Sequence, residues 1–399
     1  MNVTIYPGKA AGTVTAPPSK SMAHRLLICA GLAEGTSRIS GMGDNEDILA
    51  TMDCLRAMGV SCSVQGDTVT VTGKPLDPRE TLRCRESGST LRFFVPIALL
   101  SGKETFFAGT EKLLSRPLGI YRQLCQEHGF VFEQQKDSLR VKGDLAGGTF
   151  QIPGDVSSQF VSGLLFALPL TRQDSYIQLT TQVESRSYID LTLQALQAFG
   201  VNAWWQDSRT IFVPGGQQYQ PRDMTVEGDY SGAAFLAAMN ALGSDVQIQG
   251  LRADSLQGDK VYEQHLQSLC DGRPEIDLTD CPDLGPVLFA VAAAKNGAVF
   301  TGTRRLRLKE SDRVAAMAQE LEAFGTKILA EENSVTIIAE DFHAPERALQ
   351  GHNDHRIVMA LAVLLMLTGG QIQGAQAVSK SYPDFFEKMK QLGIEVHIR

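Results

Sequence analysis

Six segments of the chain share one arrangement of polar and apolar residues. Each begins with a short strand-like stretch, continues through a polar loop, and ends in an apolar run that stops near a glycine. The six segments are residues 17–35, 82–102, 150–170, 224–243, 276–297 and 348–370. Their runs, such as Leu26 to Ala33, are apolar on nearly every side, and a helix with that pattern is buried all round. The pattern therefore predicts six buried helices.

The residues after each segment also repeat. A short strand comes next, followed by an amphipathic helix that in most copies ends at a glycine. These helices are expected at residues 47–60, 118–130, 189–201, 261–270, 313–326 and 385–394. The three-residue spacing of Leu55 and Met58 is typical of one helix face. Alternating residues around a short polar turn then predict hairpins at residues 61–73, 131–143, 203–215 and 327–340.

The repeat indicates an α/β fold of two domains. One unit spans roughly 55–75 residues, longer than a solenoid repeat, so each unit is expected to be a packed βαβαββ structure. Six units in 399 residues favour two domains of three units each. The polar stretch 214–223 is the expected junction, which gives a first domain at residues 19–220. Residues 1–18 supply a strand before the first loop and are expected to join residues 221–399 in a discontinuous second domain.

The polar loops before the buried helices hold an unusual set of residues. They include Lys20, Ser21, Arg25, Glu86, Ser87, Ser89, Arg92, Ser157, Ser158, Gln159, Asp229, Ser231, Asp280, Asp283, Asn353, Asp354, His355 and Arg356. Ordinary N-caps are expected at Ser89, Asp229, Ser231, Asp280 and Asp354. Capping does not explain the cations, because a cation at a helix N-terminus is unfavourable unless an anion lies there as well. Helix N-termini bind anions readily, so the loops predict anionic ligands.

The densest group of charges lies within residues 301–325. A solvated connection before the helix is expected to include Arg304, Arg307 and Asp312. Alternation from Leu306 to Lys309 predicts an edge with one face toward a core. Lys309 and Arg313 lie four residues apart, with Glu310 between them. Two cations and one carboxylate suit an anionic substrate that must also exchange a proton.

Charge and cysteine content narrow the classes of partner. The formal net charge is −8 and the pI about 5.5, which argues against nucleic acid or an anionic membrane as a partner. The longest apolar run, residues 357–367, is shorter than the ~20 residues of a membrane span. The first ten residues lack the pattern of a signal peptide. Seven cysteines without metal-site spacing indicate a reducing compartment, so we expect a cytoplasmic protein.

Several short motifs follow one another along the chain. They are Ser19-Lys20-Ser21 with Arg25, Gly88 with Ser89, Thr90 and Arg92, Arg116 before a proline, Ser157-Ser158-Gln159, Ser185 with Tyr188, Pro282-Asp283, Lys309-Glu310-Ser311-Asp312-Arg313, Asp354-His355-Arg356, and Lys380. Each motif alone is weak evidence. Taken together in this order, from Pro18 to about Pro383, the motifs resemble those of the 5-enolpyruvylshikimate-3-phosphate synthase family. The resemblance implies two domains, each of three βαβαββ units, in an inside-out α/β barrel whose buried helices point their N-termini at an interdomain cleft.

The resemblance also implies an activity. The expected enzyme transfers the enolpyruvyl group of phosphoenolpyruvate to the 5-hydroxyl of shikimate 3-phosphate by addition and elimination, without a metal or cofactor, and acts as a monomer. Phosphoenolpyruvate is expected to bind Lys20, Gly88, Arg116, Gln159, Arg313, Arg356 and Lys380. Shikimate 3-phosphate is expected to bind Lys20, Ser21, Arg25, Ser157, Ser158, Gln159, Ser185, Tyr188, Asp283 and Lys309. Arginines suit these ligands because their forks bind carboxylate and phosphate with two hydrogen bonds.

The family pattern implies catalytic roles for Lys20, Asp283, Lys309 and Glu310. Glu310 is expected to give a proton to the methylene carbon, whereas the base for the hydroxyl is left open between Asp283 and Lys309. His355 is a candidate hydrogen-bond donor to substrate. The other histidines expected at surface or cap positions are His24, His128 and His265.

The chain departs from the family pattern at three positions. Glu86 stands where better-known members have asparagine, and its carboxylate would repel phosphoenolpyruvate unless it turned away or paired with a cation such as Arg92. Ser187 replaces a proline before Tyr188, and Arg305 replaces an asparagine.

Two other functions are considered. UDP-N-acetylglucosamine enolpyruvyl transferase shares the fold but uses a loop cysteine near residues 108–119, where this chain has none. Cys125 is expected in the core of the next helix. A repeat scaffold that binds a phosphorylated partner would need basic loops, but not Glu310 and Asp283 beside lysines.

Overall fold

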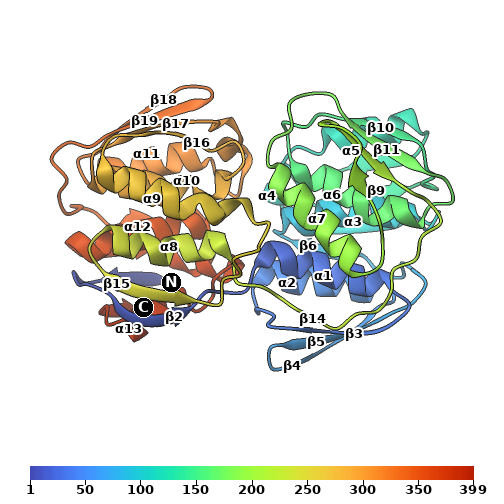
Figure 1. The fold of residues 1–399 in the computed structure, drawn as a ribbon, viewed down its shortest axis with the longest axis horizontal. Helices are drawn as coiled ribbons and strands as arrows, with labels where there is room; N and C mark the ends of the chain where they lie inside the picture. Colours follow the sequence, from blue (N-terminus) through green and yellow to red (C-terminus); the bar gives the residue numbers. More distant parts are fainter. The chain divides into compact units, whose positions relative to one another are not determined.

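The computed structural model describes all 399 residues, and the chain divides into two compact units (Figure 1). The first domain consists of residues 18–227. The second domain combines residues 1–17 with residues 228–399.

Strands near the junctions decide where each domain ends. Strand β14 (Met224–Thr225) pairs in parallel with β3 (Gly35–Ser40), so residues 221–227, which were expected in the second domain, belong to the first. Strand β2 (Ala11–Thr15) pairs in parallel with β15 (Asp245–Gln249) and places the start of the chain in the second domain. A paired strand fixes the boundary because its backbone groups need their partners in the sheet.

The first domain contains three four-stranded sheets with a common order. In the order given below, the first two strands of each sheet are parallel to each other, and the remaining neighbouring strands are antiparallel. The sheets are β14-β3-β5-β4, β6-β7-β9-β8 and β10-β11-β13-β12. Their other strands are β4 (Ser61–Gln65), β5 (Thr68–Gly73), β6 (Leu82–Arg85), β7 (Thr105–Gly109), β8 (Val131–Gln134), β9 (Ser138–Lys142), β10 (Thr149–Ile152), β11 (Ser175–Leu179), β12 (Trp204–Trp205) and β13 (Thr210–Val213).

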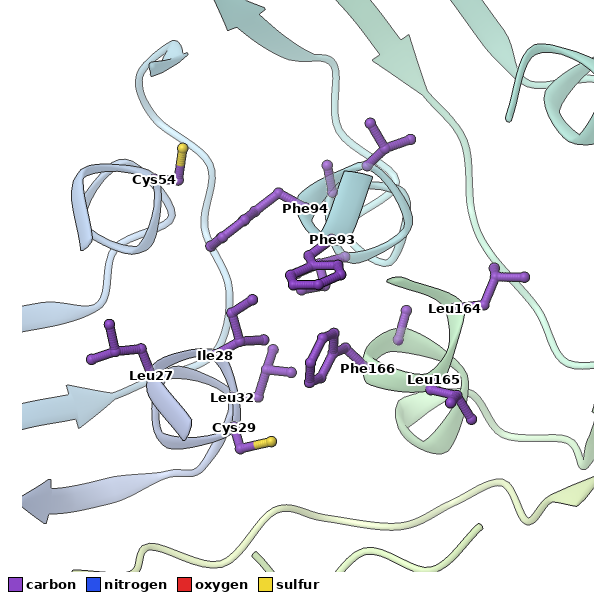
Figure 2. Close-up of a cluster of buried hydrophobic side chains, with 14 of the residues drawn as sticks. Leu27, Ile28, Cys29, Leu32, Cys54, Phe93, Phe94, Leu164, Leu165 and Phe166 are labelled. Carbon is purple, nitrogen blue, oxygen red and sulfur yellow. The ribbon is translucent and has the colours of Figure 1, made fainter. Parts of the chain in front are cut away.

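Three buried helices form the centre of the first domain. They are α1 (Lys20–Leu32), α3 (Gly88–Leu99) and α6 (Ser158–Ala167). Ile28 of α1, Phe93 of α3 and Phe166 of α6 gather in one cluster (Figure 2), where the two phenylalanine rings meet edge to face with centroids 5.3 Å apart. The other helices are α2 (Glu46–Ala57), α4 (Glu111–Leu114), α5 (Gly119–Glu127), α7 (Arg186–Ala198) and the 3₁₀ helix η1 (Leu168–Leu170).

The second domain repeats the plan in the sheets β16-β17-β19-β18 and β20-β21-β1-β22. In the latter sheet the third strand is β1, from the start of the chain, and it is antiparallel to both neighbours. The remaining strands are β1 (Asn2–Ile5), β16 (Glu275–Asp277), β17 (Ala298–Thr301), β18 (Lys327–Ala330), β19 (Ser334–Ile338), β20 (Leu349–Gln350), β21 (Gly370–Gln373) and β22 (Val396–Ile398). None of the six sheets closes into a barrel.

Three buried helices also pack together at the centre of the second domain (Figure 1). They are α8 (Tyr230–Ala241), α10 (Gly285–Ala294) and α12 (His355–Thr368). The six predicted buried helices are therefore confirmed. The other helices are α9 (Tyr262–Asp271), α11 (Arg313–Glu322), α13 (Phe385–Gln391), and the 3₁₀ helices η2 (Gly258–Val261), η3 (Pro282–Leu284), η4 (Arg304–Leu308) and η5 (Ala375–Lys380). No helix combines the length and the apolar character that a membrane span requires.

One unit of the second domain lacks the hairpin that the βαβαββ plan implies for it. Its sheet contains only β15 and β2. Helix α9 ends at Asp271 and β16 begins at Glu275, which leaves no room for two further strands. The side-chain amide of Asn240 instead donates to the carbonyl of Val246 and accepts from its N–H, both at 2.7 Å. A groove of about 610 Å³ lies between α8, β15 and α9, beside this bonded strand edge.

The charged stretch before α11 is a tight helical turn, so the predicted alternating edge is wrong. In η4, Leu306 is buried while Leu308 is 42% exposed, and the two leucines therefore do not share a buried face. Arg305 is buried instead. An alternation of four residues was too short to separate a strand from a 3₁₀ turn.

Replacing Phe93 with Ala should lower the free energy of unfolding by about 3–5 kcal/mol, because its ring is buried among the three central helices. Chemical denaturation followed by circular dichroism measures the change. Phe106→Ala is the matched control, since that ring is 44% exposed, and it should cost less than about 1 kcal/mol. Equal losses for the two variants would contradict the packing.

Candidate active site

Side chains cap five of the six central helices. The caps of α1, α3, α6, α8 and α12 are Ser19, Ser87, Ser157, Asp229 and Asp354. The predicted caps at Asp229 and Asp354 are therefore confirmed. Those at Ser89, Ser231 and Asp280 are wrong, because Ser89 and Ser231 lie inside helices and α10 has no side-chain cap.

Arg25 is a buried cation of the first domain whose partners are neutral. Its Nε donates to Thr192 Oγ1 (2.9 Å), and its terminal nitrogens donate to the carbonyls of Ser21 (2.6 Å) and Tyr188 (2.7 Å) and to Ser162 Oγ (3.5 Å). Burial lowers the pKa of Arg25 to about 10. Because none of these partners is a carboxylate, the charge of Arg25 favours an anionic ligand. Of the residues predicted to bind shikimate 3-phosphate, Ser21 and Tyr188 lie beside this cation.

The turn into α7 adds one more predicted residue, Ser185, next to Tyr188. Ser185 is buried and has left-handed backbone geometry, with φ of +54°, directly before the helix. Tyr188 follows in the first turn of α7 and supplies the carbonyl that Arg25 binds. A non-glycine residue in this region stores strain, and such strain persists only where the surroundings hold it.

A chain of buried hydrogen bonds links α1, α2 and α3. His24 Nδ1 lies 2.7 Å from Thr51 Oγ1, which lies 2.8 Å from Thr90 Oγ1. Beside this chain, Lys20 Nζ pairs with Asp47 Oδ2 at 2.9 Å. The expectation of a surface or cap position for His24 is wrong, because α1 is buried on all sides. Burial, followed by two nearby cations, holds the pKa of His24 well below its ordinary value.

Gly88 begins α3 where two guanidinium groups approach the backbone. A Cβ at this position would lie 2.8 Å from Arg116 Nη1 and 3.3 Å from Arg92 Nη1. Arg92 Nη1 donates to Gln159 Oε1 at 2.6 Å. Three of the residues predicted to bind phosphoenolpyruvate, Gly88, Arg116 and Gln159, are therefore close together. Glu86 is half-buried just before them.

In the second domain the guanidinium of Arg313 binds three carboxylates. It is 1% exposed and donates to Asp354 (2.9 Å), Asp283 (2.8 Å) and Glu310 (2.7 Å). These carboxylates raise the pKa of Arg313 above its usual value, against the effect of burial. Arg313 thereby fixes the positions of two predicted catalytic residues, Asp283 and Glu310.

Asp283 is shared among three cations. Besides Arg313, it contacts Lys309 Nζ at 3.3 Å and Arg356 Nη2 at 3.0 Å. Burial favours the neutral acid, but Arg356, Lys309 and Arg313 together hold the pKa of Asp283 well below its usual value. Burial lowers the pKa of Lys309, while Asp283 opposes this effect. Arg356 also donates to Ser231 Oγ at 3.0 Å, which links α12 to α8.

The loop before α12 completes this group. Lys380 Nζ donates to the carbonyl of Asn353 at 2.8 Å. Asp354, the N-cap of α12, also accepts from Ser311 Oγ at 2.9 Å. His355 is buried, with Nδ1 3.8 Å from Asp354 Oδ1.

Sequence reasoning missed two residues, Asp47 and Thr192, and a second role of Asp354. Asp47 pairs with Lys20, Thr192 binds Arg25, and Asp354 binds Arg313 in addition to its cap role. Thr192 carried a usable signal, because it lies four residues after Tyr188 and so on the same helix face. Asp47 and the second role of Asp354 carried none, because their partners are far away in sequence.

Comparison with known families connects this geometry to an activity. The sequence model of the family described as "EPSP synthase (3-phosphoshikimate 1-carboxyvinyltransferase)" matches residues 6–389. A 3-phosphoshikimate 1-carboxyvinyltransferase of Clostridium kluyveri is 40% identical over 427 aligned positions, which cover 99% of this chain and 98% of the relative. One from Clostridium perfringens is 39% identical over 98% of both chains.

Solved structures agree with the sequence comparison. The EPSP synthase from Acinetobacter baumannii covers all of this chain and is itself fully covered, with a TM-score of 0.82 and 25% identity. The enolpyruvyl transferase NikO from Streptomyces tendae has a TM-score of 0.78 with 16% identity, and it covers 99% of this chain and 98% of its own. The second comparison supports the fold alone.

Replacing Arg313 with Leu should lower the free energy of unfolding at neutral pH by about 3–5 kcal/mol, because it leaves three carboxylates without their buried cation. The lowered pKa values of Asp283 and Asp354 stabilise the wild type above the ordinary carboxyl range, and this contribution disappears as pH falls through the folded-state pKa. Wild-type stability should therefore rise between about pH 2 and 5, and the variant should lose the part of that rise that comes from Asp354, since Arg356 and Lys309 still lower the pKa of Asp283.

Denaturant titrations at several pH values measure both effects. Arg252→Leu is the control, because the Arg252 side chain is 58% exposed beside an exposed Asp254, and it should cost less than about 1 kcal/mol. A variant at Arg313 with the wild-type pH slope would show that the carboxylates do not depend on this cation.

Proposed function

Since the chain belongs to the EPSP synthase (3-phosphoshikimate 1-carboxyvinyltransferase) family, whose members transfer the enolpyruvyl group of phosphoenolpyruvate to shikimate 3-phosphate, we propose a division of that reaction between its two domains. The chain is a transferase of the shikimate pathway. The observation that carries the proposed division is the cluster of Asp283, Lys309 and Glu310 around Arg313, because it combines anion-binding cations with groups that can move a proton.

The first domain binds anionic groups of both substrates. Each substrate carries a phosphate and a carboxylate, so several negative charges need partners. Arg25 supports a role in binding shikimate 3-phosphate because its buried charge is matched only by neutral oxygens. The residues assigned to that ligand are Ser21, Arg25, Ser157, Ser158, Gln159, Ser185 and Tyr188. Those assigned to phosphoenolpyruvate are Lys20, Gly88, Arg116 and Gln159.

The second domain provides the proton chemistry and the remaining cations. Arg356 and Lys380 are assigned to phosphoenolpyruvate, and Asp283 and Lys309 to the hydroxyl groups of shikimate 3-phosphate. Arg313 is given a positioning role, because three carboxylates already occupy its guanidinium. This assignment replaces the expectation that Arg313 contacts phosphoenolpyruvate directly.

The addition step needs one base and one acid. Asp283 is a poor proton acceptor because three cations lower its pKa, whereas burial lowers the pKa of Lys309 and brings this group closer to the neutral form. Lys309 therefore accepts the proton of the 5-hydroxyl as the oxygen bonds to the central carbon of phosphoenolpyruvate. Glu310 gives a proton to the methylene carbon, which becomes a methyl group.

The elimination step reverses the proton transfer at carbon. Glu310 takes a proton back from the methyl group, the carbon–carbon double bond forms again, and the bond between carbon and the phosphate oxygen breaks. The proton that Lys309 took from the 5-hydroxyl passes to the departing phosphate, which therefore leaves as hydrogen phosphate, and Lys20 offsets its remaining charge. One carboxylate thus serves as acid and then as base.

The proposal also includes the cellular compartment and the oligomeric state of the enzyme. All seven cysteines are free thiols, which is typical of a reducing compartment, and we infer a cytoplasmic enzyme. That it acts as a monomer stays a prediction.

Replacing Gly88 with Ala should raise the KM for phosphoenolpyruvate by at least about tenfold, a loss of about 1.4 kcal/mol, because the new methyl group displaces the Arg116 guanidinium. Stability should change by less than about 1 kcal/mol, since the obstructing atoms are the ends of flexible side chains. Steady-state kinetics with a phosphate-release assay measures the effect. Gly119→Ala is the matched control, because a Cβ there meets nothing within 4 Å. If the two variants had the same KM, Gly88 would not shape this subsite.

Replacing Glu310 with Gln should lower kcat by about 10²–10⁴-fold, because the amide keeps a bond to Arg313 but cannot transfer the proton. Dissociation constants for both substrates, measured by calorimetry, should change by less than about threefold. Glu322→Gln, at an exposed position later in α11, should keep wild-type turnover. A parallel loss of binding and turnover would refute the proton role.

A further inference from the structure

Glu320 is a buried carboxylate that lies outside every motif described above. It occupies α11 seven residues after Arg313, which is two helical turns further along the same face. Its side chain is fully buried and makes three contacts: Oε1 lies 2.8 Å from His352 Nε2, while Oε2 accepts from Arg347 Nη1 (2.7 Å) and from the N–H of Gln350 (3.1 Å). Burial opposes ionisation, but His352 and Arg347 hold the pKa of Glu320 below its usual value.

His352 belongs to a strained turn that leads directly into the site. His352 and Asn353 are successive non-glycine residues with left-handed backbone, at φ of +50° and +53°. The carbonyl of Asn353 accepts the hydrogen bond from Lys380. Asp354 follows as the cap of α12 and the partner of Arg313. Two adjacent left-handed residues persist only where surrounding contacts hold them.

Packing leaves this turn little freedom on its other side. A Cβ at Gly351 would lie 2.7 Å from Val358 Cγ2 and 2.9 Å from the carbonyl of Gly374. The Gly351 N–H also donates to the carbonyl of Gln373 at 2.8 Å. Helix α11 therefore holds the turn at two points, through Glu320 at His352 and through Arg313 at Asp354.

We propose that Glu320 and His352 are positioning residues that hold the left-handed turn and thereby place Lys380 and Arg356 for phosphoenolpyruvate. The inference rests on the proposed assignment of these two cations to that substrate. If the contact with Glu320 is removed, the turn relaxes toward ordinary backbone geometry and the Asn353 carbonyl moves away from Lys380. The groups assigned to shikimate 3-phosphate in the first domain are unaffected.

Steady-state kinetics of the full-length enzyme tests the proposal. His352→Leu removes the bond to Glu320 and should raise the KM for phosphoenolpyruvate about tenfold. The KM for shikimate 3-phosphate should change less than twofold, because Arg313 and Lys309 still hold Asp283 when Arg356 moves. His352→Gln can still donate to Glu320 and should restore the KM to within about twofold of the wild type. Combining His352→Leu with Glu320→Gln should add no further rise, because both changes break the same contact.

Arg347→Met is the matched control. It removes another partner of the same buried carboxylate, but Arg347 precedes the turn and its side chain is 43% exposed. It should leave both KM values within twofold of the wild type. If Arg347→Met raised the KM for phosphoenolpyruvate as much as His352→Leu, the loss of any partner of the buried Glu320 carboxylate would cause the effect. The proposal would then fail.

Two further readouts separate positioning from simple stability. A purely structural role for His352 would lower the melting temperature and the apparent kcat without moving either KM, and that result would overturn the proposal. Amide hydrogen exchange of residues 351–356 should be faster in His352→Leu than in the wild type, whereas unchanged exchange would contradict it.

Lys380→Met shows whether the underlying substrate assignment is correct. If this variant keeps the wild-type KM for phosphoenolpyruvate, the assignment of Lys380 fails independently of the turn. Hydrogen exchange then decides the positioning claim alone: faster exchange in His352→Leu supports it, and wild-type exchange overturns it.

Discussion

Burial of the central helices is the constraint from which the rest of the structure follows. A helix that is covered on every side can present polar groups only at its ends, and the N–H groups of its first turn need partners there. Serines and aspartates cap α1, α3, α6, α8 and α12, and charged side chains collect around those caps. The same constraint that stabilises each domain therefore concentrates its chemistry at one end of the central helices.

The two domains balance their buried charges differently. In the first domain, Arg25 is surrounded by hydroxyl and carbonyl oxygens, so its charge is matched by dipoles alone. In the second domain, Arg313 and Asp283 form a network in which each charge has several opposite partners. The first arrangement suits the binding of an anion, and the second holds acids and bases in fixed positions without a large net charge.

The repeat explains the architecture and also its exception. Five sheets share one pattern of a parallel pair followed by two antiparallel pairs, whereas the sheet of β15 and β2 has no hairpin. The exposed edge of β15 is tolerated because the Asn240 amide satisfies both backbone groups of Val246, as a neighbouring strand would. The sheet of β20, β21, β1 and β22 shows the opposite case, since it is completed by the start of the chain. Local pattern therefore indicates the unit, but pairing across the chain decides how each unit is closed.

The sequence by itself determined the six buried helices and the two-domain plan, and it predicted most residues of the candidate site, because apolar periodicity and ordered motifs are local properties of the chain. Only the tertiary structure decided that β14 joins the first domain and that Arg313 binds three carboxylates. It also decided that Glu320 binds His352, which is 32 residues away in the sequence. It also placed His24 in the core and turned residues 304–308 into a 3₁₀ helix. The physical reason is that burial and ion pairing depend on which distant segments of the chain come into contact. The spacing of residues along the sequence does not specify those contacts.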